Sequence, residues 1–213
     1  MQEIKDLNAY RTSLKDKILE TAMDAFTKNG IRAVKMDDIA MSLSISKRTL
    51  YEIYGGKESL LFACLRKEYQ VKRLYMAEYA NNHNVIEVVG EVYRRQVERL
   101  KDVNYLFYED IQLYPNIVKF MEDEHANTYE EFLSFMQRGV KEGFFRKDVN
   151  YELVHQMFDM IGEAVTKKGL YSKYPYEELL TNLLLVPFRG FCTTKGLKML
   201  EASMKKNHLS FTL

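Results

Sequence analysis

The sequence predicts an all-α protein. The chain has 213 residues but only three prolines, and runs in which apolar and polar residues alternate are scarce. Apolar residues instead recur at intervals of three and four along most of the chain, which is the period of an amphipathic helix. No repeat, low-complexity segment or Gly/Ser-rich linker is present. We therefore expect domains that meet within continuous helical structure rather than across a flexible tether.

The apolar stripes and the turn residues between them position the expected helices. The first begins near Thr12 or Ser13 and ends at "KNG", with Gly30 as its C-cap residue. Two short helices follow, one from Met36 to Leu43 and one after Ser46. Longer helices are expected over residues 57–79, 85–100, 103–113, 117–142, 151–168 and 176–192. Pro187 is expected to end or kink the last of these, and "RGFCTTKG" to form a bend after it.

Composition and termini point to a cytoplasmic protein. The N-terminal "MQEIKDLNAYR" mixes acidic and basic residues without an apolar run, which argues against a secretory signal. The longest apolar stretch, "LLLVPF", is far shorter than the roughly 20 residues that span a bilayer, so we expect no membrane contact. Cys64 and Cys192 lie far apart in apolar surroundings and are expected to be small buried hydrophobic residues.

Enzyme chemistry has no support in the sequence. No Gly-rich phosphate loop, nucleophile elbow or Cys-x-x-Cys motif occurs, and the four histidines fall on separate expected elements. We expect no catalytic residue and no cofactor.

The segment "DIAMSLSISKRTLYEIYGGKESL", from Asp38 to Leu60, has the pattern of a helix-turn-helix. Five apolar residues supply the small core between its two helices, and Ala40 is small where these helices must cross. Those five residues are Ile39, Leu43, Ile45, Leu50 and Ile53. Ser46 can cap the second helix. Ser44 occupies the turn position that glycine often fills, which would cost roughly 1 kcal/mol if the backbone there is left-handed.

The outward residues of the second helix suit the major groove of DNA. From Lys28 to Lys57 the chain has six lysine and arginine residues against three acidic ones, although the whole chain has a net charge of only +1. A helix in the major groove contacts phosphates with its flanks and base edges near its N-terminal end. The expected DNA-binding residues are Lys35, Ser46, Lys47, Arg48, Thr49, Tyr51 and Lys57. Arg48 is the expected base reader, because a guanidinium can pair with guanine through two hydrogen bonds.

The segment from Ile18 to Leu61 resembles the N-terminal domain of the TetR family of bacterial transcriptional regulators. The resemblance rests on Phe26-x-x-x-Gly30, the "DDIA" helix, the "SKRTLY" recognition helix and the "K-E-x-L" start of the next helix. The chain departs from the family pattern at Ser44, at Tyr54 where phenylalanine is usual, and at the double glycine before Lys57. The resemblance implies a homodimeric regulator, most often a repressor, that binds a palindromic operator in double-stranded DNA.

The resemblance also implies two domains. Residues 1–57 are expected to form a three-helix DNA-binding domain, and residues 58–213 a larger helical domain for ligand binding and dimerisation. In this family the last two long helices usually form a four-helix dimer interface. The expected dimer residues are Met157, Phe158, Ile161, Leu180, Leu183, Leu184 and Phe188. The alternative is that these stripes only close the core of one chain.

The middle helices are rich in large amphipathic side chains. Such residues most often form a core, but a cavity with an apolar wall and a few hydroxyl groups would suit a small hydrophobic or aromatic effector. The expected ligand-binding residues are Phe62, Tyr69, Tyr105, Tyr108, Phe132 and Met136.

Two other functions remain open at this stage. One is a helical protein-interaction module without sequence-specific DNA binding, in which the basic helix meets an acidic partner. The other is a metal-responsive regulator, since Glu122 and His125 lie three residues apart within "MEDEHANTYEE". A solvated acidic surface explains this segment more simply, so we assign no metal ligand.

Overall fold

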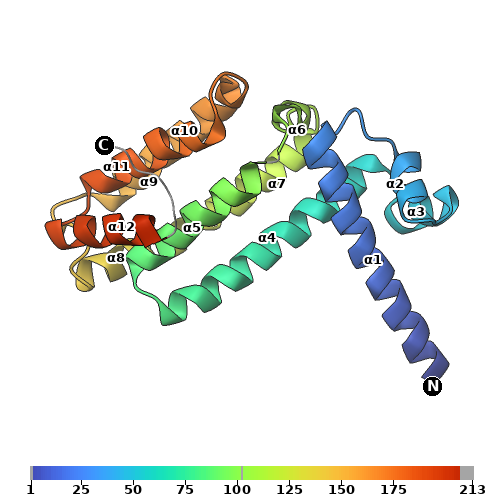
Figure 1. Cartoon of the computed structure of the whole chain (residues 1–213), viewed down its shortest axis with the longest axis horizontal. Coiled ribbons are helices and arrows are strands. Elements are labelled where there is room, and N and C mark those ends of the chain that lie inside the picture. The colour runs from blue at the N-terminus through green and yellow to red at the C-terminus, as the bar shows by residue number, and fades with distance from the viewer. Residues whose placement is uncertain (1, 102, 207–213) are drawn as a thin grey trace. The chain divides into compact units, whose positions relative to one another are not determined.

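Helices make up about 80% of the protein, and the described residues form no strand. The computed structural model describes residues 2–101 and 103–206, and Figure 1 shows the order of its helices. The helices are α1 (Gln2–Asn29), α2 (Met36–Ser42), α3 (Lys47–Tyr54), α4 (Lys57–Asn82), α5 (Val85–Leu100), α6 (Tyr105–Ile111), α7 (Pro115–Ala126), α8 (Tyr129–Lys141), α9 (Tyr151–Lys167), α10 (Tyr176–Leu180), α11 (Val186–Gly190) and α12 (Thr194–Lys206). A 3₁₀ turn at Leu170–Ser172 precedes α10, and a π-helical turn at Thr181–Leu185 joins α10 to α11. The expected all-α fold is confirmed.

The helices pack into two compact units. The first contains residues 1–73 and 102–118, and the second contains residues 74–101 and 119–213. Helix α4 therefore contributes to both units, and so does α7. Packing assigns residues 57–73 of α4 and all of α6 to the same unit as α1–α3. The expected functional boundary between residues 57 and 58 stays a prediction.

In the first unit, α1 supplies the central apolar stripe. Ile18, Ala22 and Phe26 are fully buried at intervals of four residues, the spacing that keeps side chains on one helix face. Helices α2 and α6 both pack against α1, and α3 packs against α2. Gly30 ends α1 with φ of 83°, a left-handed conformation that suits glycine, as its expected C-cap role requires.

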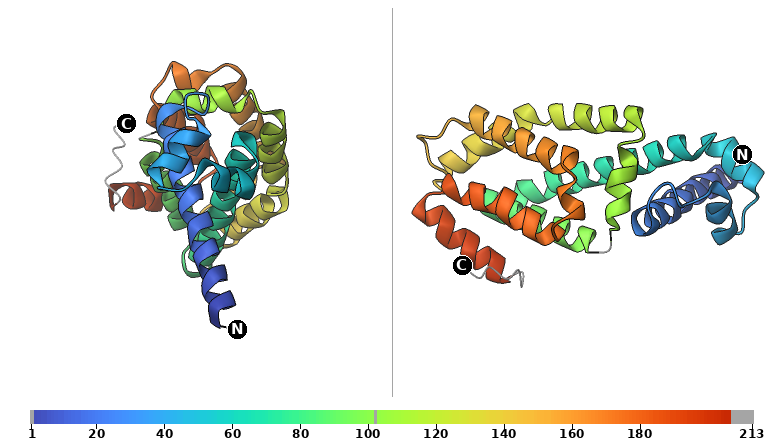
Figure 2. Two further views of the ribbon diagram at one scale, coloured as in Figure 1. Left: turned by 90° about the vertical axis from the view of Figure 1, so that its right-hand side faces the viewer. Right: turned by 90° about the horizontal axis from the view of Figure 1, so that it is seen from above.

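The second unit has its own core around α5, α8 and the C-terminal helices, which Figure 2 colours from green to red. Three of its buried aromatic residues are Phe145, Phe188 and Phe191, whose rings meet edge to face at 4.7 to 5.8 Å. Gly139 approaches this group so closely that a Cβ atom there would lie 2.0 Å from Phe145 Cδ2. The core thus requires glycine at this position of α8.

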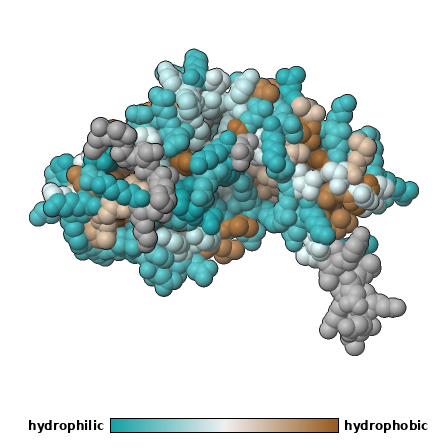
Figure 3. Space-filling model, in the orientation of Figure 1, coloured by the Kyte–Doolittle hydropathy of each residue, from teal (hydrophilic) through white to brown (hydrophobic). Residues whose placement is uncertain are grey.

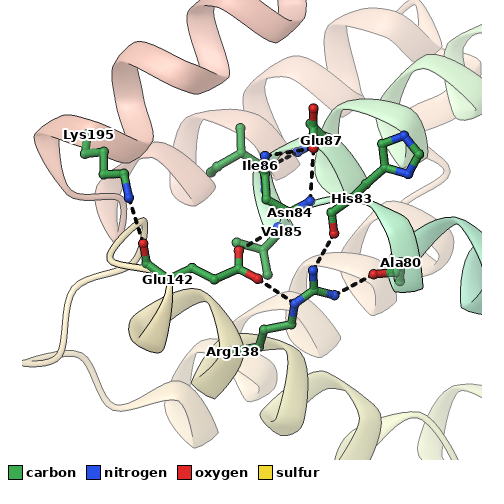
Figure 4. Close-up of polar contacts among 9 residues, drawn as sticks. All are labelled: Ala80, His83, Asn84, Val85, Ile86, Glu87, Arg138, Glu142 and Lys195. Carbon is green, nitrogen blue, oxygen red and sulfur yellow. Dashed lines mark hydrogen bonds and ion pairs between the residues drawn. The ribbon is translucent and has the colours of Figure 1, made fainter.

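The turn between α4 and α5 is held by a polar network in the second unit (Figure 4). Arg138 on α8 donates hydrogen bonds to the carbonyls of Ala80, at 2.7 Å, and His83, and its Nε lies 2.6 Å from Glu142 Oε1. The other oxygen of Glu142 accepts the N–H of Val85 at 3.1 Å. One guanidinium therefore satisfies carbonyls at the end of α4, and its carboxylate partner satisfies an amide at the start of α5.

Two expected helix boundaries were wrong. Helix α1 begins at Gln2 rather than near Thr12, and no proline or glycine lies between these positions to stop it. The expected helix over 117–142 is two helices, because the chain turns at residues 127–128. There the hydroxyl of Thr128 donates to the carbonyl of His125 at 2.7 Å, a local bond that competes with helix continuation.

The C-terminal segment also differs from expectation. "RGFCTTKG" leads into a further helix, α12, that the sequence did not predict. Helix α12 packs against α5 and buries Leu200 and Met204. Its Gly196 looked like a turn residue, but a Cβ there would lie 2.3 Å from the carbonyl oxygen of Phe144. Glycine is needed at this position for close packing rather than for a bend.

Pro187 does not end the preceding helix, which continues to Gly190. A π-helical turn at Thr181–Leu185 comes immediately before α11, the helix that contains Pro187. Such a wider turn can accommodate the proline ring and its missing N–H within a helix.

The surface seen in Figure 3 is mostly hydrophilic, with hydrophobic residues in separate patches. Among the described residues, no helix combines the length and apolar character that crossing a membrane requires. Cys64 and Cys192 are free and buried, as expected. Burial raises the thiol pKa to about 12 for Cys64 and about 11 for Cys192, so neither is a reactive thiolate near neutral pH.

Candidate nucleic-acid interface

Helices α2 and α3 form the expected helix-turn-helix. Ile39, Ala40 and Leu50 are buried between them and α1, at 1%, 3% and 0% exposure. Leu43, Ile45 and Ile53 complete the small core and are half-buried. In the turn, Ser44 has φ of 54°, so the left-handed conformation considered from the sequence is present with serine in place of glycine.

Ser46 fixes the start of α3. Its Oγ accepts the N–H of Thr49 at 3.0 Å, which satisfies one of the free amides of the first helical turn. The hydroxyls of Ser46 and Thr49 also lie 2.8 Å apart and share a hydrogen bond. Both residues were expected to contact DNA, and the structure gives both a positioning role within α3.

The exposed face of α3 carries Lys47, Arg48 and Tyr51. The side chain of Arg48 is 87% exposed and that of Lys47 is 58% exposed. Each cation has an acidic neighbour: Lys47 Nζ lies 2.8 Å from Asp37, and Arg48 Nε lies 2.7 Å from Glu52. The hydrogen bond and charge of Asp37 raise the pKa of Lys47.

These ion pairs are compatible with phosphate binding. Exposed pairs contribute about 0–1 kcal/mol, so the cations can exchange a carboxylate for a phosphate at little energetic cost. Asp37 and Glu52 hold the two side chains near the helix in the free protein. The sequence contained both acids, but only the fold brings Asp37 of α2 to Lys47 of α3.

The loop between α1 and α2 ends at Lys35, which is exposed and precedes α2 as its N-cap residue. Its N–H donates to Asp38 Oδ2 at 3.1 Å. The Lys35 ammonium therefore remains a candidate phosphate contact at the start of α2.

Lys57 lies differently from expectation. Its ammonium donates to the carbonyls of Ile31, Arg32 and Val34 at 2.9, 3.2 and 2.8 Å. Burial lowers its pKa. In this structure Lys57 fastens the α1–α2 loop to the start of α4, and a phosphate contact by this residue stays a prediction.

Asp110 on α6 holds the same loop from another side and was not singled out from the sequence. Asp110 is 8% exposed, and its carboxylate accepts the N–H of Arg32 at 2.7 Å. Asn104, just before α6, donates its own N–H to the carbonyl of Thr27 at 2.8 Å. Asp110 could have been recognised from its place in the largely apolar segment "YLFYEDI". An acid buried with such a segment needs a hydrogen-bond partner.

The expected ligand-binding residues fall in both units. Four belong to the first unit and two to the second. Of the latter, Met136 is 3% exposed in the core and Phe132 packs against that core. Tyr105, in the first unit, is 49% exposed. Phe62, Tyr69 and Tyr108, also in the first unit, are half-buried. Their role in ligand binding stays a prediction.

The expected dimer residues also differ in burial, from buried in the core to half-buried. Leu180 and Phe188 are buried in the core of the second unit, at 9% and 4% exposure, and Phe158 and Leu184 pack against that core. Met157, Ile161 and Leu183 are half-buried. The most exposed apolar residues of α9 are instead Leu153 and Met160, at 61% and 62%.

A helix-turn-helix whose second helix is capped and bears exposed cations is typical of DNA-binding regulators. Residues 18–64 match the family described as bacterial regulatory proteins, tetR family. Residues 18–64 are therefore similar to the TetR family of bacterial transcriptional regulators.

Characterised relatives agree with this assignment. The chain is 25% identical over 171 residues to the HTH-type transcriptional repressor KstR2 of Mycolicibacterium smegmatis, covering 71% of this chain and 77% of that protein. It is 24% identical over 131 residues to the biofilm operon icaADBC negative transcriptional regulator IcaR of Staphylococcus aureus, covering 61% of this chain and 67% of that protein. Both relatives are named as transcriptional regulators, which supports a DNA-binding regulator rather than an enzyme.

Solved structures share the fold. A putative transcriptional regulator from Saccharomonospora viridis, in complex with choline, superposes with a TM-score of 0.67 at 18% identity, covering 85% of this chain and 99% of that chain. KstR2 of Mycobacterium tuberculosis, a ketosteroid transcriptional regulator, gives a TM-score of 0.55 at 19% identity, covering 84% of this chain and 95% of that one.

Proposed function

We propose that the protein is a homodimeric repressor that binds a palindromic DNA operator through α3 and releases it when a small hydrophobic or aromatic molecule binds. DNA binding, the first half of this proposal, is supported by the exposed face of α3. Lys47, Arg48 and Tyr51 lie there on a helix whose start is fixed by Ser46 and whose inner face is fixed by buried Leu50. Such a helix is already ordered in the free protein, so its cations and phenol can bind DNA with little cost in conformational entropy.

The residues divide into two proposed roles. Lys47, Tyr51 and Lys35 contact phosphates, which set the position of the protein on the duplex. Arg48 reads a base edge, because its guanidinium is the most exposed cation of α3 and pairs well with guanine. Ser46 and Thr49 act mainly by holding the first turn of α3.

The proposed function needs a dimer, because one helix-turn-helix makes few base contacts. Two copies bind half-sites about 34–36 Å apart, one helical turn of DNA. The C-terminal helices of the second unit are the proposed source of the interface, because α9 exposes Leu153 and Met160 to solvent. Two-fold symmetry of the dimer then explains a palindromic operator.

Effector release is proposed by comparison with regulators of the same fold, one of which was solved in complex with choline. A ligand that prefers a protein conformation with misaligned α3 helices weakens DNA binding about tenfold for each 1.4 kcal/mol of preference.

The test is a selection of genomic DNA fragments by the purified full-length protein. Wild type is compared with a Lys47→Ala, Tyr51→Ala double variant. The matched control is Lys173→Ala, Tyr174→Ala, which makes the same two changes at exposed positions of the second unit. We expect wild type and control to enrich one palindromic motif, and the α3 variant to lose it. Circular dichroism verifies that the variants remain folded.

Salt dependence separates DNA binding from the interaction-module alternative. With the selected motif, affinity should fall steeply as salt rises, and removing Lys47 should reduce the slope of log K against log salt by about 1. A protein that enriches no motif at moderate salt would instead use the basic helix on an acidic protein partner.

A further inference from the structure

Two histidines and one aspartate converge in the second unit. His125 lies near the end of α7, and His155 and Asp159 lie one turn apart on α9. His155 Nδ1 is 3.0 Å from Asp159 Oδ2, and His125 Nδ1 is 3.4 Å from Asp159 Oδ1. One ligand atom from each residue lies within 4.8 Å of the other two.

We propose that His125, His155 and Asp159 bind a divalent transition metal ion, with Zn²⁺ as the best match. Nitrogen and oxygen ligands of zinc lie about 2.0–2.2 Å from the ion in a tetrahedron, which places them roughly 3.3–3.6 Å from each other. The distance from His125 Nδ1 to Asp159 Oδ1 already falls in this range, and the distance from His155 Nδ1 to the other oxygen, Asp159 Oδ2, is slightly shorter. Three protein ligands leave a fourth position for water.

The two histidines of the proposed site differ in their surroundings: His155 is held by packed aromatic rings, whereas His125 is exposed. His155 is 9% exposed, and the rings of Tyr129 and Phe132 meet its imidazole edge to face at 4.9 and 5.1 Å. The side chain of His125 is 62% exposed. An ion can therefore enter from the His125 side, and a small rotation of that imidazole closes the ligand set.

Asp159 Oδ1 lies 3.4 Å from His125 Nδ1 but makes no hydrogen bond in the described part of the chain. This oxygen is itself buried. A buried oxygen without a partner costs about 1–3 kcal/mol, and more when charged, so a cation at this position would remove the penalty. A helical His–Asp pair by itself explains the 3.0 Å contact, but it explains neither the convergence of a second histidine nor the unsatisfied oxygen.

The donor set selects the class of metal. Imidazole nitrogen suits Zn²⁺, Ni²⁺ and Cu²⁺, whereas Ca²⁺ and Mg²⁺ prefer sites made of oxygen. The sequence had suggested Glu122 with His125, but the fold pairs His125 with two residues of α9. Metal binding would tie α7 to α9 within the second unit.

The experiment is a metal titration of tag-free, chelator-treated full-length protein. Isothermal titration calorimetry follows Zn²⁺, and the visible absorption of Co²⁺ reports a tetrahedral site with nitrogen and oxygen ligands. His125→Ala removes the exposed ligand, and Asp159→Asn removes the carboxylate charge with little change in shape. Glu122→Gln, one turn away on α7, is the matched control.

We expect one Zn²⁺ per chain in wild type and in Glu122→Gln, with affinity at least tenfold weaker in His125→Ala and in Asp159→Asn. Circular dichroism of the apo variants separates lost ligands from lost folding, and the exposed His125 variant is the one expected to keep its fold. The proposal is overturned if wild type binds neither Zn²⁺ nor Co²⁺, or if folded His125→Ala binds as tightly as wild type. Because the readout is metal binding itself, the result does not depend on whether the protein binds DNA.

Discussion

Ser44 is a position where the sequence conflicts with the backbone that it adopts. Its φ of 54° lies in the left-handed region, where the side chain of an L-residue is unfavourable by roughly 1–2 kcal/mol. Buried Ile39 and Leu50 on either side fix the turn, so the helix-turn-helix forces this conformation on serine.

We predict that Ser44→Gly stabilises the protein by about 1 kcal/mol, because glycine adopts positive φ without steric strain. For a chain of this size the midpoint of thermal unfolding should rise by about 2–4 °C. Ser44→Ala is the control, since it removes the hydroxyl but keeps the Cβ. Equal midpoints for the glycine variant and wild type would show that the turn is not strained.

Lys57 shows why a charged residue cannot be assigned a partner from its position alone. The sequence places it at the start of a helix, where a lysine next to free amides suggests a phosphate contact. The fold brings the carbonyls of residues 31, 32 and 34 to its ammonium instead. Those carbonyls come from a loop more than twenty residues earlier in the chain.

At the scale of elements, Glu91 joins α5 to the part of α4 in the second unit. Glu91 is 7% exposed, and its carboxylate accepts hydrogen bonds from Tyr75, at 2.8 Å, and from Arg94 and Arg95. Hydrogen bonds from Arg94, together with those of the other two residues, lower its pKa to about 2. The guanidinium of Arg95 also lies 3.4 Å from the centre of the Tyr75 ring.

We predict that Glu91→Gln lowers the free energy of unfolding at pH 7 by on the order of 3 kcal/mol. The folded pKa is below the unfolded one, so the contribution of Glu91 is present above about pH 4.5 and is lost as pH falls toward about 2. Wild type and variant should therefore converge in acid. Urea unfolding at pH 7, 5 and 3 measures this difference.

Glu98→Gln serves as the control, because Glu98 also pairs with Arg94 but its side chain is 57% exposed. An exposed pair contributes about 0–1 kcal/mol. If Glu91→Gln and Glu98→Gln have the same small effect at pH 7, the buried network does not stabilise the α4–α5 pair as described.

The periodicity of apolar residues predicted most of the helices, but it predicted neither the break between α7 and α8 nor helix α12. The break between α7 and α8 depends on a local bond from Thr128 to His125 and has no proline or glycine to mark it. Helix α12 contains Gly196, which lowers its apparent helix propensity, but packing against α5 stabilises it. Tertiary contacts outweigh local preference in the second case.

At the scale of the whole molecule, the exposed apolar residues of α9 are the proposed centre of a dimer interface. Leu153 and Met160 are seven residues apart, so both lie on one face of the helix. Each is more than 60% exposed in the single chain. A stable dimer buries about 1,200–2,000 Å², and a face built on α9 would contribute the apolar centre of such an interface.

We predict that Leu153→Glu, Met160→Glu converts a dimer into a monomer, because two carboxylates cannot be buried against their symmetry copies without a large desolvation penalty. Sedimentation velocity at micromolar concentration measures the change. Leu74→Glu is the control, since Leu74 is equally exposed, at 65%, but lies on α4. Should the α9 variant remain a dimer, the interface lies on another surface.

The sequence by itself determined the helical class, the helix-turn-helix and its basic residues, because these depend on periodicity and on spacing within about 25 residues. Only the tertiary structure decided which cations are held by Asp37 and by the α1–α2 loop, which apolar residues face solvent, and which residues gather around His155. These properties depend on contacts such as Lys47 with Asp37, Arg32 with Asp110 and His125 with Asp159. A linear pattern specifies the faces of each helix, but the packing of helices selects which faces meet.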